Sequence, residues 1–445
     1  MRHYIALAAA AAALTVSVLD ARDASACGGC FAPPENPSVV TDHRMSLSIS
    51  KDQTTLYDQI RYQGDPKSFA WVLPIRGTVT VGLSSDLLFG TLDGMTQTQV
   101  QAPPRNCPAL NCGGASSPTA FGDSADAGTN GVVVNKHEVV GPYDTVQLSA
   151  TDPTALKTWL QTNGFNLPAD VEPVVSQYVT EKFDFLALKL VPGQGVSSMR
   201  PVRITTAGAA AALPLRMVAA GTGSTVGITL WVVGEGRYEP QNFPMFRIQD
   251  SELEWDWSTS RSNYAELRAA KTAASQGKAW ELESSTTQSP IQVGNIVRSG
   301  GYYYGYGGPS QPADKDYLPD TPNGKSADQV REEDLTTLFH GLTGDVRVTR
   351  LRADLAHTSL DQDLALLASA DQSNLTQYRI AAKSKNAPAC PTCGPGLDSN
   401  GQPVGYGLRC DTANTAPGSK EVGFSAVALL GFVGFSVIRR RRRSP

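Results

Sequence analysis

Seven cysteines offer the most distinctive chemistry in this 445-residue chain, and six of them form three close pairs. The pairs are Cys27 with Cys30, Cys107 with Cys112, and Cys390 with Cys393, while Cys410 stands alone. In an oxidising compartment such pairs are typical of disulfides that staple loops, so these six are disulfide candidates. Because the total is odd, at least one cysteine is free, lipidated, paired between chains or removed by processing, with Cys410 and Cys27 as the candidates.

Two of these pairs also have the C-x-x-C spacing of zinc ligands and of thiol oxidoreductases. The spacing argues against zinc, because the two pairs lie at opposite ends of the chain, whereas zinc ribbons bring their pairs from nearby hairpins. A redox motif needs a helix to begin at the second cysteine, and Phe31-Ala32-Pro33-Pro34 forbids one. We therefore expect no metal site and no cofactor.

Four tyrosines form a second candidate site: Tyr302, Tyr303, Tyr304 and Tyr306, within a glycine-rich stretch. Aromatic rings on a flexible backbone can stack against a sugar or a peptide, although low-complexity loops of this kind can also be passive. The tyrosines therefore suggest a binding site for an envelope polysaccharide or protein.

Catalytic signatures are missing from the chain. Gly423-Phe424-Ser425 lacks the final glycine of a nucleophile elbow, and Gly324-Lys325-Ser326 lacks the first glycine of a phosphate-binding loop. The histidines after residue 26 do not form a metal-binding motif, and we interpret each as structural or exposed. We assign no catalytic residue and favour a binding or structural role. The alternative is an envelope hydrolase with an unrecognised acidic active site.

The two ends of the chain indicate export. Residues 1–26 combine Arg2, an apolar stretch and the small residues Ala24-Ser25-Ala26, as a signal peptide does. Residues 422–438 form an apolar run that spans about 25 Å as a helix, enough for a minimal membrane span. The arginines of 439–445 should stay cytoplasmic, so we expect a single-pass protein of the bacterial cell envelope.

Charge argues against a nucleic-acid partner. The formal net charge is −4. Since the C-terminal arginine cluster is strongly basic, the exported part must be more acidic than this total. The membrane, reached through the C-terminal helix, is therefore the expected partner, besides a possible polysaccharide or protein ligand.

Hydrophobic periodicity predicts an α+β fold: one large, mainly antiparallel sheet domain with several short helices, plus one C-terminal membrane helix. Met45, Leu47 and Ile49 alternate with serines as in a half-buried strand. Residues 56–62 and 69–73 should be neighbouring antiparallel strands. Further strands are expected at 132–140, 144–148, 183–191, 225–233, 280–283 and 345–351.

Helices are predicted where apolar residues recur at helical spacing. Ser84 or Ser85 should cap a helix that presents Leu87, Leu88 and Leu92. Other helices are expected from Asp152-Pro153 to Gly164 and at 171–180, 263–275, 328–340 and 359–369. In the last of these, Asp361 and Asp363 should occupy the first turn.

Several segments together resemble the bacterial family named domain of unknown function 2330. They are Cys27-Gly28-Gly29-Cys30-Phe31, Tyr62-Gln63-Gly64-Asp65-Pro66, Phe69-Ala70-Trp71-Val72-Leu73-Pro74, Phe185-Leu186-Ala187-Leu188-Lys189-Leu190, Leu230-Trp231-Val232-Val233-Gly234 and Val348-Thr349-Arg350-Leu351-Arg352. This resemblance covers roughly residues 27–380 and implies an exported envelope protein, with no catalytic residue to transfer.

The C-terminal tail resembles the tripartite sorting signal of myxobacterial surface proteins, which consists of a cysteine, an apolar helix and an arginine cluster. That resemblance implies removal of the tail and transfer to the cell surface, whereas a retained tail would be a simple membrane anchor. The predicted organisation is a signal peptide (1–26), an exported domain (27–383), a Cys/Pro/Gly-rich stalk (384–421), a transmembrane helix (422–438) and a cytoplasmic arginine cluster (439–445).

Overall fold

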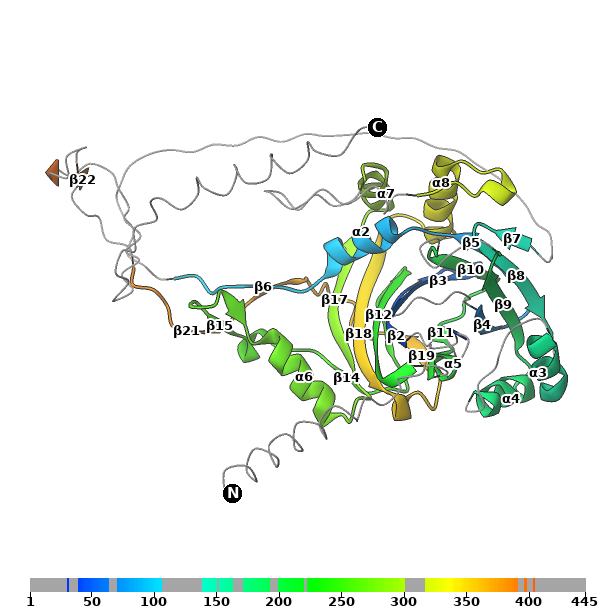
Figure 1. Cartoon of the computed structure of the whole chain (residues 1–445). Coiled ribbons are helices and arrows are strands. Elements are labelled where there is room, and N and C mark those ends of the chain that lie inside the picture. Colours follow the sequence, from blue (N-terminus) through cyan, green and yellow to red (C-terminus); the bar gives the residue numbers. More distant parts are fainter. Residues whose placement is uncertain are drawn as a thin grey trace, which may run out of the picture. The chain divides into compact units, whose positions relative to one another are not determined.

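The computed structural model describes residues 30–31, 39–63, 70–105, 138–149, 152–162, 171–192, 199–219, 222–300, 317–390, 396–397 and 403–404. These residues fall into two units, one within 1–103 and 122–387 and the other within 104–121 and 388–445. In the smaller unit, β22 (Gly396–Leu397) and β23 (Pro403–Val404) pair antiparallel. The larger unit holds every other helix and strand given below (Figure 1).

An eight-stranded sheet forms the centre of the larger unit, in the order β14-β17-β18-β12-β2-β3-β10-β5. Its strands are β2 (Val39–Ile49), β3 (Gln53–Gln63), β5 (Thr80–Leu83), β10 (Val202–Ala207), β12 (Thr222–Gly234), β14 (Met245–Phe246), β17 (Trp280–Gln288) and β18 (Val346–Ala356). Neighbours run antiparallel except for two parallel pairs, β12 with β2 and β14 with β17.

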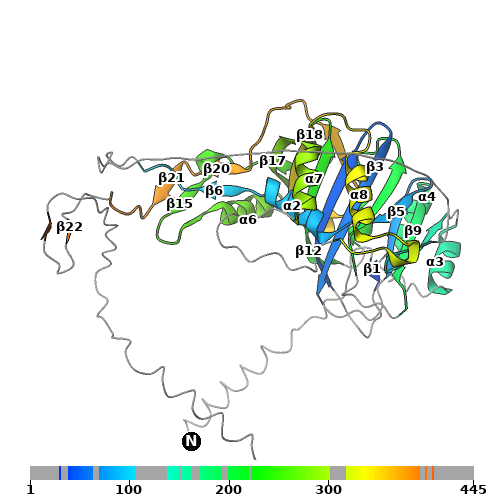
Figure 2. The same cartoon turned by 90° about the horizontal axis from the view of Figure 1, so that it is seen from above.

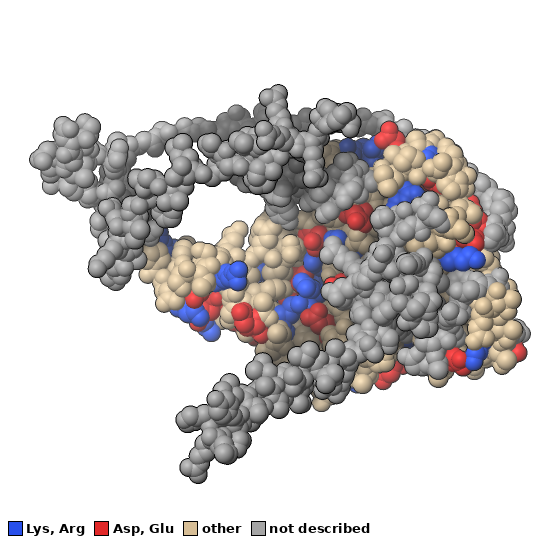
Figure 3. All heavy atoms as spheres, in the orientation of Figure 1, with Lys and Arg blue, Asp and Glu red and all other residues tan. Residues whose placement is uncertain are grey.

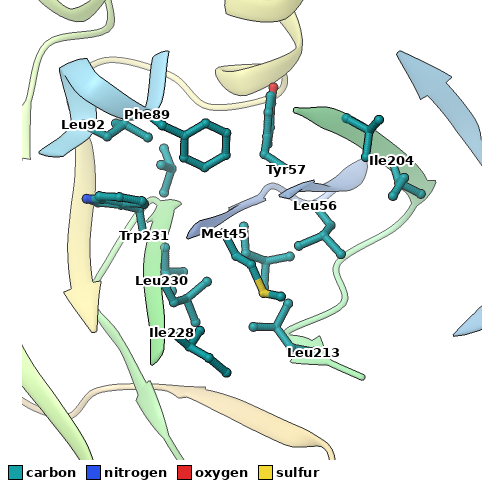
Figure 4. Packing of buried hydrophobic residues seen from close by; sticks show 14 of the residues in the cluster. Met45, Leu56, Tyr57, Phe89, Leu92, Ile204, Leu213, Ile228, Leu230 and Trp231 are labelled. Carbon is teal, nitrogen blue, oxygen red and sulfur yellow. The ribbon is translucent and has the colours of Figure 1, made fainter. Parts of the chain in front are cut away.

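Both faces of this sheet carry large apolar side chains, because successive residues of a strand point to opposite faces. Met45 lies on the face that also carries Leu56 of β3, whereas Tyr57 and Trp231 lie on the opposite face. Figure 4 shows Trp231 next to Phe89, with Met45 and Leu56 on the other side of the strands. Each face therefore needs a covering layer.

A five-stranded antiparallel sheet, ordered β1-β4-β9-β8-β7, covers the Met45 face. Its strands are β1 (Cys30–Phe31), β4 (Ala70–Ile75), β7 (Glu138–Val140), β8 (Tyr143–Leu148) and β9 (Asp184–Leu190). Trp71 and Leu73 of β4 join the main core, whereas Val72 joins a second core on the far side.

The prediction that 56–62 and 69–73 are neighbouring strands is therefore wrong. β3 pairs with β2 and β10, and β4 pairs with β1 and β9, so the two runs belong to different sheets. Leu56 and Trp71 both contribute to the core between the sheets. The apolar faces of β3 and β4 are thus buried because their two sheets stack face to face, and not because the strands pair within one sheet.

Helices cover the two outer faces and complete a four-layer arrangement (Figure 2). The helices are α2 (Asp86–Thr96), α3 (Pro153–Thr162), α4 (Glu172–Thr180), α5 (Leu215–Ala219), α6 (Tyr264–Ala274), α7 (Pro290–Arg298) and α8 (Ala327–Leu338), with the 3-10 turns η2 (Asp250–Glu252), η4 (Thr321–Asn323) and η5 (His357–Ser359). α2, α7 and α8 cover the Trp231 face, while α3 and α4 pack on the five-stranded sheet. Ser85 caps α2 as predicted, accepting a hydrogen bond from the Leu87 amide at 2.9 Å.

Short strands make three smaller sheets. The strands are β11 (Ala212–Leu213), β19 (Leu364–Ala368) and β13 (Tyr238–Pro240) in the first, β16 (Arg261–Ser262), β15 (Glu254–Asp256) and β21 (Lys383–Lys385) in the second, and β20 (Tyr378–Ile380) with β6 (Gln99–Gln101) in the third. The helix predicted at 359–369 is wrong, because η5 and β19 occupy this region. Leu364 and Leu366 are buried while Leu367 is 57% exposed, which is the period of a strand. Asp363 therefore lies before a strand, where it binds Arg216 instead of capping a helix.

The predicted mixed fold with mostly antiparallel sheets is confirmed, with seven α-helices among the described residues. Nothing in the described part of the chain forms a helix long and apolar enough to cross a bilayer. The predicted membrane helix (422–438), the signal peptide (1–26) and the arginine cluster (439–445) lie outside the described residues.

Candidate functional site

Two buried glutamates on β17 form the centre of the candidate site. Glu281 is 1% exposed and Glu283 is 2% exposed. Glu281 pairs with Arg352 of β18 and Ser284 pairs with Arg350, so the ladder skips Glu283 at a β-bulge. Bulges of this kind re-aim a side chain, and here both carboxylates reach the same tyrosine.

Helix α6 supplies the groups that contact the glutamates from outside the sheet. The Tyr264 hydroxyl contacts Glu281 Oε1 at 2.7 Å and Glu283 Oε1 at 3.3 Å. Arg268, one helical turn later, places Nε 3.4 Å from Glu281 Oε2 and Nη2 2.5 Å from Asp354 Oδ2. No residue of α6 is fully buried. The helix is held by these polar contacts together with the packing of Tyr264 and Leu267 against a small apolar cluster that contains Ile248 and Leu253.

Arg350 neutralises the second glutamate from within the sheet. Its Nε pairs with Glu283 and its Nη1 pairs with Asp93 of α2. Its guanidinium also lies 5.1 Å from the ring centroid of Trp231. We call Glu281, Glu283, Tyr264, Arg268 and Arg350 the acidic pair site. Charged side chains of both signs also lie next to one another across the middle of the face shown in Figure 3.

Burial and the neighbouring Glu283 raise the pKa of Glu281 to about 7, from an ordinary value of 4.5. Burial and the two carboxylates also raise the pKa of Tyr264 well above its usual value. Glu281 can therefore exchange a proton near neutral pH, while Tyr264 stays a hydrogen-bond donor. This chemistry suits general acid or base catalysis, and it also makes the docking of α6 dependent on pH.

A second buried carboxylate, Asp334 of α8, has a different environment. Its Oδ2 accepts hydrogen bonds from Ser84 Oγ and Tyr317 OH, both at 2.6 Å, and its Oδ1 lies 3.1 Å from Arg203 Nη1. The Tyr57 hydroxyl donates to its main-chain oxygen at 3.2 Å. Burial still raises the pKa of Asp334, although Arg203 opposes the shift. We interpret this cluster as a structural anchor for α8.

A third group lines a small internal cavity. His43 Nδ1 lies 3.3 Å from Asp58 Oδ1, and both residues are buried. His43 Nε2 has no hydrogen-bond partner in the described part of the chain. The cavity beside it, walled mainly by apolar side chains such as Trp71 and Met217, has a volume of about 10 Å³, enough for a single water. The prediction that the histidines are structural suits His43.

The family model for "Uncharacterized protein conserved in bacteria (DUF2330)" matches residues 21–318. The chain belongs to this family. The family resemblance drawn from the sequence is therefore confirmed, whereas the resemblance of the tail to a sorting signal stays a prediction. The family carries no described activity, so membership does not assign a role to the acidic pair site.

Comparison with other known proteins adds little. No curated protein matches the chain. The crystal structure of baculovirus P35 is similar over 75% of this chain and 98% of that one, with 9% identity and a TM-score of 0.29. A likeness this weak supports no conclusion about fold or function.

The structure places few of the site residues that the sequence singled out. Tyr302, Tyr303, Tyr304 and Tyr306 lie outside the described residues, as do all the candidate cysteines except Cys30 and Cys390. No disulfide between two described cysteines is shown, so the pairings stay predictions. The described residues contain no cluster of metal-ligating side chains.

Sequence reasoning missed the acidic pair site. A strand was expected at 280–283, but its glutamates were not considered as a site. One signal was available, because Glu281 and Glu283 alternate with the large apolar residues Trp280 and Leu282. Such alternation normally places polar side chains in solvent. Here Tyr264 and Arg268 cover the polar face, and nothing near the glutamates in the sequence indicates that cover.

Proposed function

We propose that this chain is an exported envelope protein, membrane-anchored or sorted to the cell surface, that acts by binding or as a structural element. The signal-like N-terminus and the apolar C-terminal run support export. Membership of a family conserved in bacteria is compatible with this location.

The observation that carries the proposed role is the way buried arginines brace the larger unit. Five arginines are at most 7% exposed: Arg203, Arg216, Arg237, Arg350 and Arg379. Each makes an ion pair with a carboxylate that lies elsewhere in the fold. Arg216, for example, reaches both Glu181, the residue after α4, and Asp363 at 2.7 Å. Such bracing favours a rigid scaffold that presents loops to a partner.

Export can be tested with protease added to sealed spheroplasts. The proposal expects digestion of the bulk of the protein while a cytoplasmic control protein stays intact. Complete protection of the chain under these conditions would contradict export.

Partner binding can be tested at the tyrosine-rich segment. We expect replacement of Tyr302, Tyr303, Tyr304 and Tyr306 by alanine to abolish binding to isolated envelope polysaccharide or to a captured envelope protein, without loss of folding. Tyr378→Ala is a suitable control, because Tyr378 is 49% exposed and lies on β20. If the quadruple variant keeps every detected ligand, the tyrosine site is wrong.

An envelope hydrolase is the second candidate function, and the acidic pair site favours it. Glu281 has a pKa of about 7 and lies beside a second glutamate. In such a pair one carboxyl group can act as the acid and the other as the base. The hydrolase hypothesis expects Glu281→Gln and Glu283→Gln each to abolish release of sugars or peptides from isolated envelope material. Equal release by the wild type and both variants would exclude these glutamates as catalytic groups.

A further inference from the structure

Arg247, beside β14, is affected by the charges of two arginines from separate segments, Arg379 and Arg237. Arg247 directly follows β14. Arg379, on β20, is 2% exposed and donates through Nη2 to the carbonyl of Ile248, the residue after Arg247. The pKa of Arg247 is lowered, mainly by burial and further by the positive charges of Arg379 and Arg237. Arg379 and Arg237 thus each oppose the positive charge of Arg247.

The carboxylates nearby do not pair with all of these arginines. Arg379 pairs with Asp250 at 2.5 Å, and Arg237 pairs with Asp371 at 2.7 Å and with Glu239 at 3.1 Å. Arg247 makes no ion pair within 4 Å among the described residues. Asp250 and Glu281 act on Arg247 only at longer range.

Two guanidinium nitrogens also lack acceptors. Arg247 Nε and Arg379 Nη1 are buried, and neither has a hydrogen-bond partner in the described part of the chain. A buried donor without an acceptor is costly, and a bound water or ion is a common explanation. A water could satisfy a donor of this kind, but only an anion would also offset the charge of Arg247.

We propose that Arg247 and Arg379 form a binding site for a compact phosphate group. A phosphate carries several acceptor oxygens and negative charge, and arginine is well suited to recognise it. Arg247 is only half-buried and the Asp250 side chain is 56% exposed, so the site borders solvent. The proposal is independent of the export and partner roles proposed above. The phosphate can be free in solution or part of a phospholipid headgroup.

Asp250 gives the proposal an unusual test, because its carboxylate competes with a phosphate for Arg379. Removing this charge should strengthen phosphate binding, whereas removing the Arg247 charge should weaken it. General damage to the fold would weaken binding in both variants. Opposite effects therefore distinguish a phosphate site from a purely structural role of these residues.

The experiment is a calorimetric titration of the full chain in detergent with inorganic phosphate, at an ionic strength held constant with chloride. We expect saturable binding, about tenfold weaker for Arg247→Gln and several-fold tighter for Asp250→Asn. Arg261→Gln is the matched control, since Arg261 on β16 is exposed, and should bind like the wild type. Far-UV circular dichroism checks that each variant is folded.

Two outcomes would overturn the proposal: no saturable phosphate binding by the wild type, or an unchanged affinity in Arg247→Gln. Vesicles containing phosphatidic acid then identify the source. Vesicle binding that inorganic phosphate displaces would support a lipid headgroup, and phosphate binding without vesicle binding would support free phosphate. Vesicle binding that is equally strong in Arg247→Gln would place lipid recognition elsewhere and contradict the headgroup assignment.

Discussion

Buried carboxylates help to hold both α8 and α6 in place, but they belong to opposite partners in the two contacts. Asp334 belongs to α8 itself and is surrounded by donors from β10, from Ser84 and from Tyr317, while Val330, Leu335 and Leu338 of the same helix are buried. The acidic pair lies on the sheet and receives Tyr264 and Arg268 from a helix without a buried residue.

The difference shows how one buried carboxylate stabilises a helix, whereas two neighbouring carboxylates make the docking of a helix depend on pH. Asp334 has more donors than it has negative charges, so its ion pair is locally saturated. Glu281 and Glu283 instead repel each other, which contributes to the raised pKa of Glu281. We therefore expect α6 to loosen when Glu281 ionises.

The largest effect should come from Asp334→Ala. This change leaves the Arg203 guanidinium buried without its main partner, and such breaks cost about 3–5 kcal/mol of unfolding free energy. Urea denaturation measures the loss. The control is Glu333→Gln, whose side chain is 43% exposed and should cost about 1 kcal/mol or less. Similar losses in both variants would contradict the anchoring role of Asp334.

The next effect is a pH dependence that depends on Glu281. Because its pKa is higher in the folded state than in the unfolded chain, the folded state binds this proton more tightly. Its stabilising contribution is complete below about pH 4.5 and disappears as the pH rises through about 7. The shift corresponds to a loss on the order of 3 kcal/mol between these limits.

Denaturation of the wild type and of Glu281→Gln between pH 4.5 and pH 8 measures this contribution. Glutamine mimics the protonated acid, so the variant should lose most of the decline seen in the wild type. Glu332→Gln is the control, because Arg298 lowers the pKa of Glu332 and this group titrates below the window. A wild-type decline that persists unchanged in Glu281→Gln would refute the assignment.

A smaller effect is expected from Tyr264→Phe, which removes the hydroxyl shared by both glutamates. Loss of this donor should cost about 1–3 kcal/mol and raise the pKa of Glu281 further, since the hydrogen bond now lowers it. Hydrogen exchange should accelerate in α6 but stay unchanged in α8. With Tyr378→Phe as an exposed control, equal exchange in both helices would contradict selective loosening of α6.

The smallest effect should follow Arg298→Gln. Arg298 pairs with Glu332 at 2.7 Å, but both side chains are more than two-fifths exposed, at 45% and 44%. Exposed pairs of this kind contribute about 1 kcal/mol or less. Thermal denaturation of this variant gives a baseline for the buried clusters, and a loss as large as that of Asp334→Ala would remove the contrast between them.

Local elements were predictable because their signals lie within a few residues. Ser85 and the spacing of Leu87, Leu88 and Leu92 predicted α2, and the alternation of Met45, Leu47 and Ile49 predicted part of β2. Sheet assignment depends instead on which apolar faces meet in space. This is why β3 and β4 were wrongly paired, and why β19 was wrongly taken for a helix.

The acidic pair site was harder to predict for the same reason. Asp93 and Arg350 are brought together by the packing of α2 on β18, and no sequence pattern links two residues so far apart. Glu281 and Tyr264 are closer in the chain, but their contact depends on how α6 returns over β17. Burial of the glutamates follows from this tertiary arrangement and not from their own segment.

The central parallel pair of strands has a consequence for the timing of folding. β2 ends at Ile49, yet its partner β12 begins only at Thr222. At about 5–20 residues per second, synthesis from the first strand to the second takes on the order of ten seconds or longer. During that interval one edge of β2 has no native partner, and closing so large a loop is slow even afterwards. A chaperone or translocase that acts on incompletely folded chains would therefore find this chain in that state.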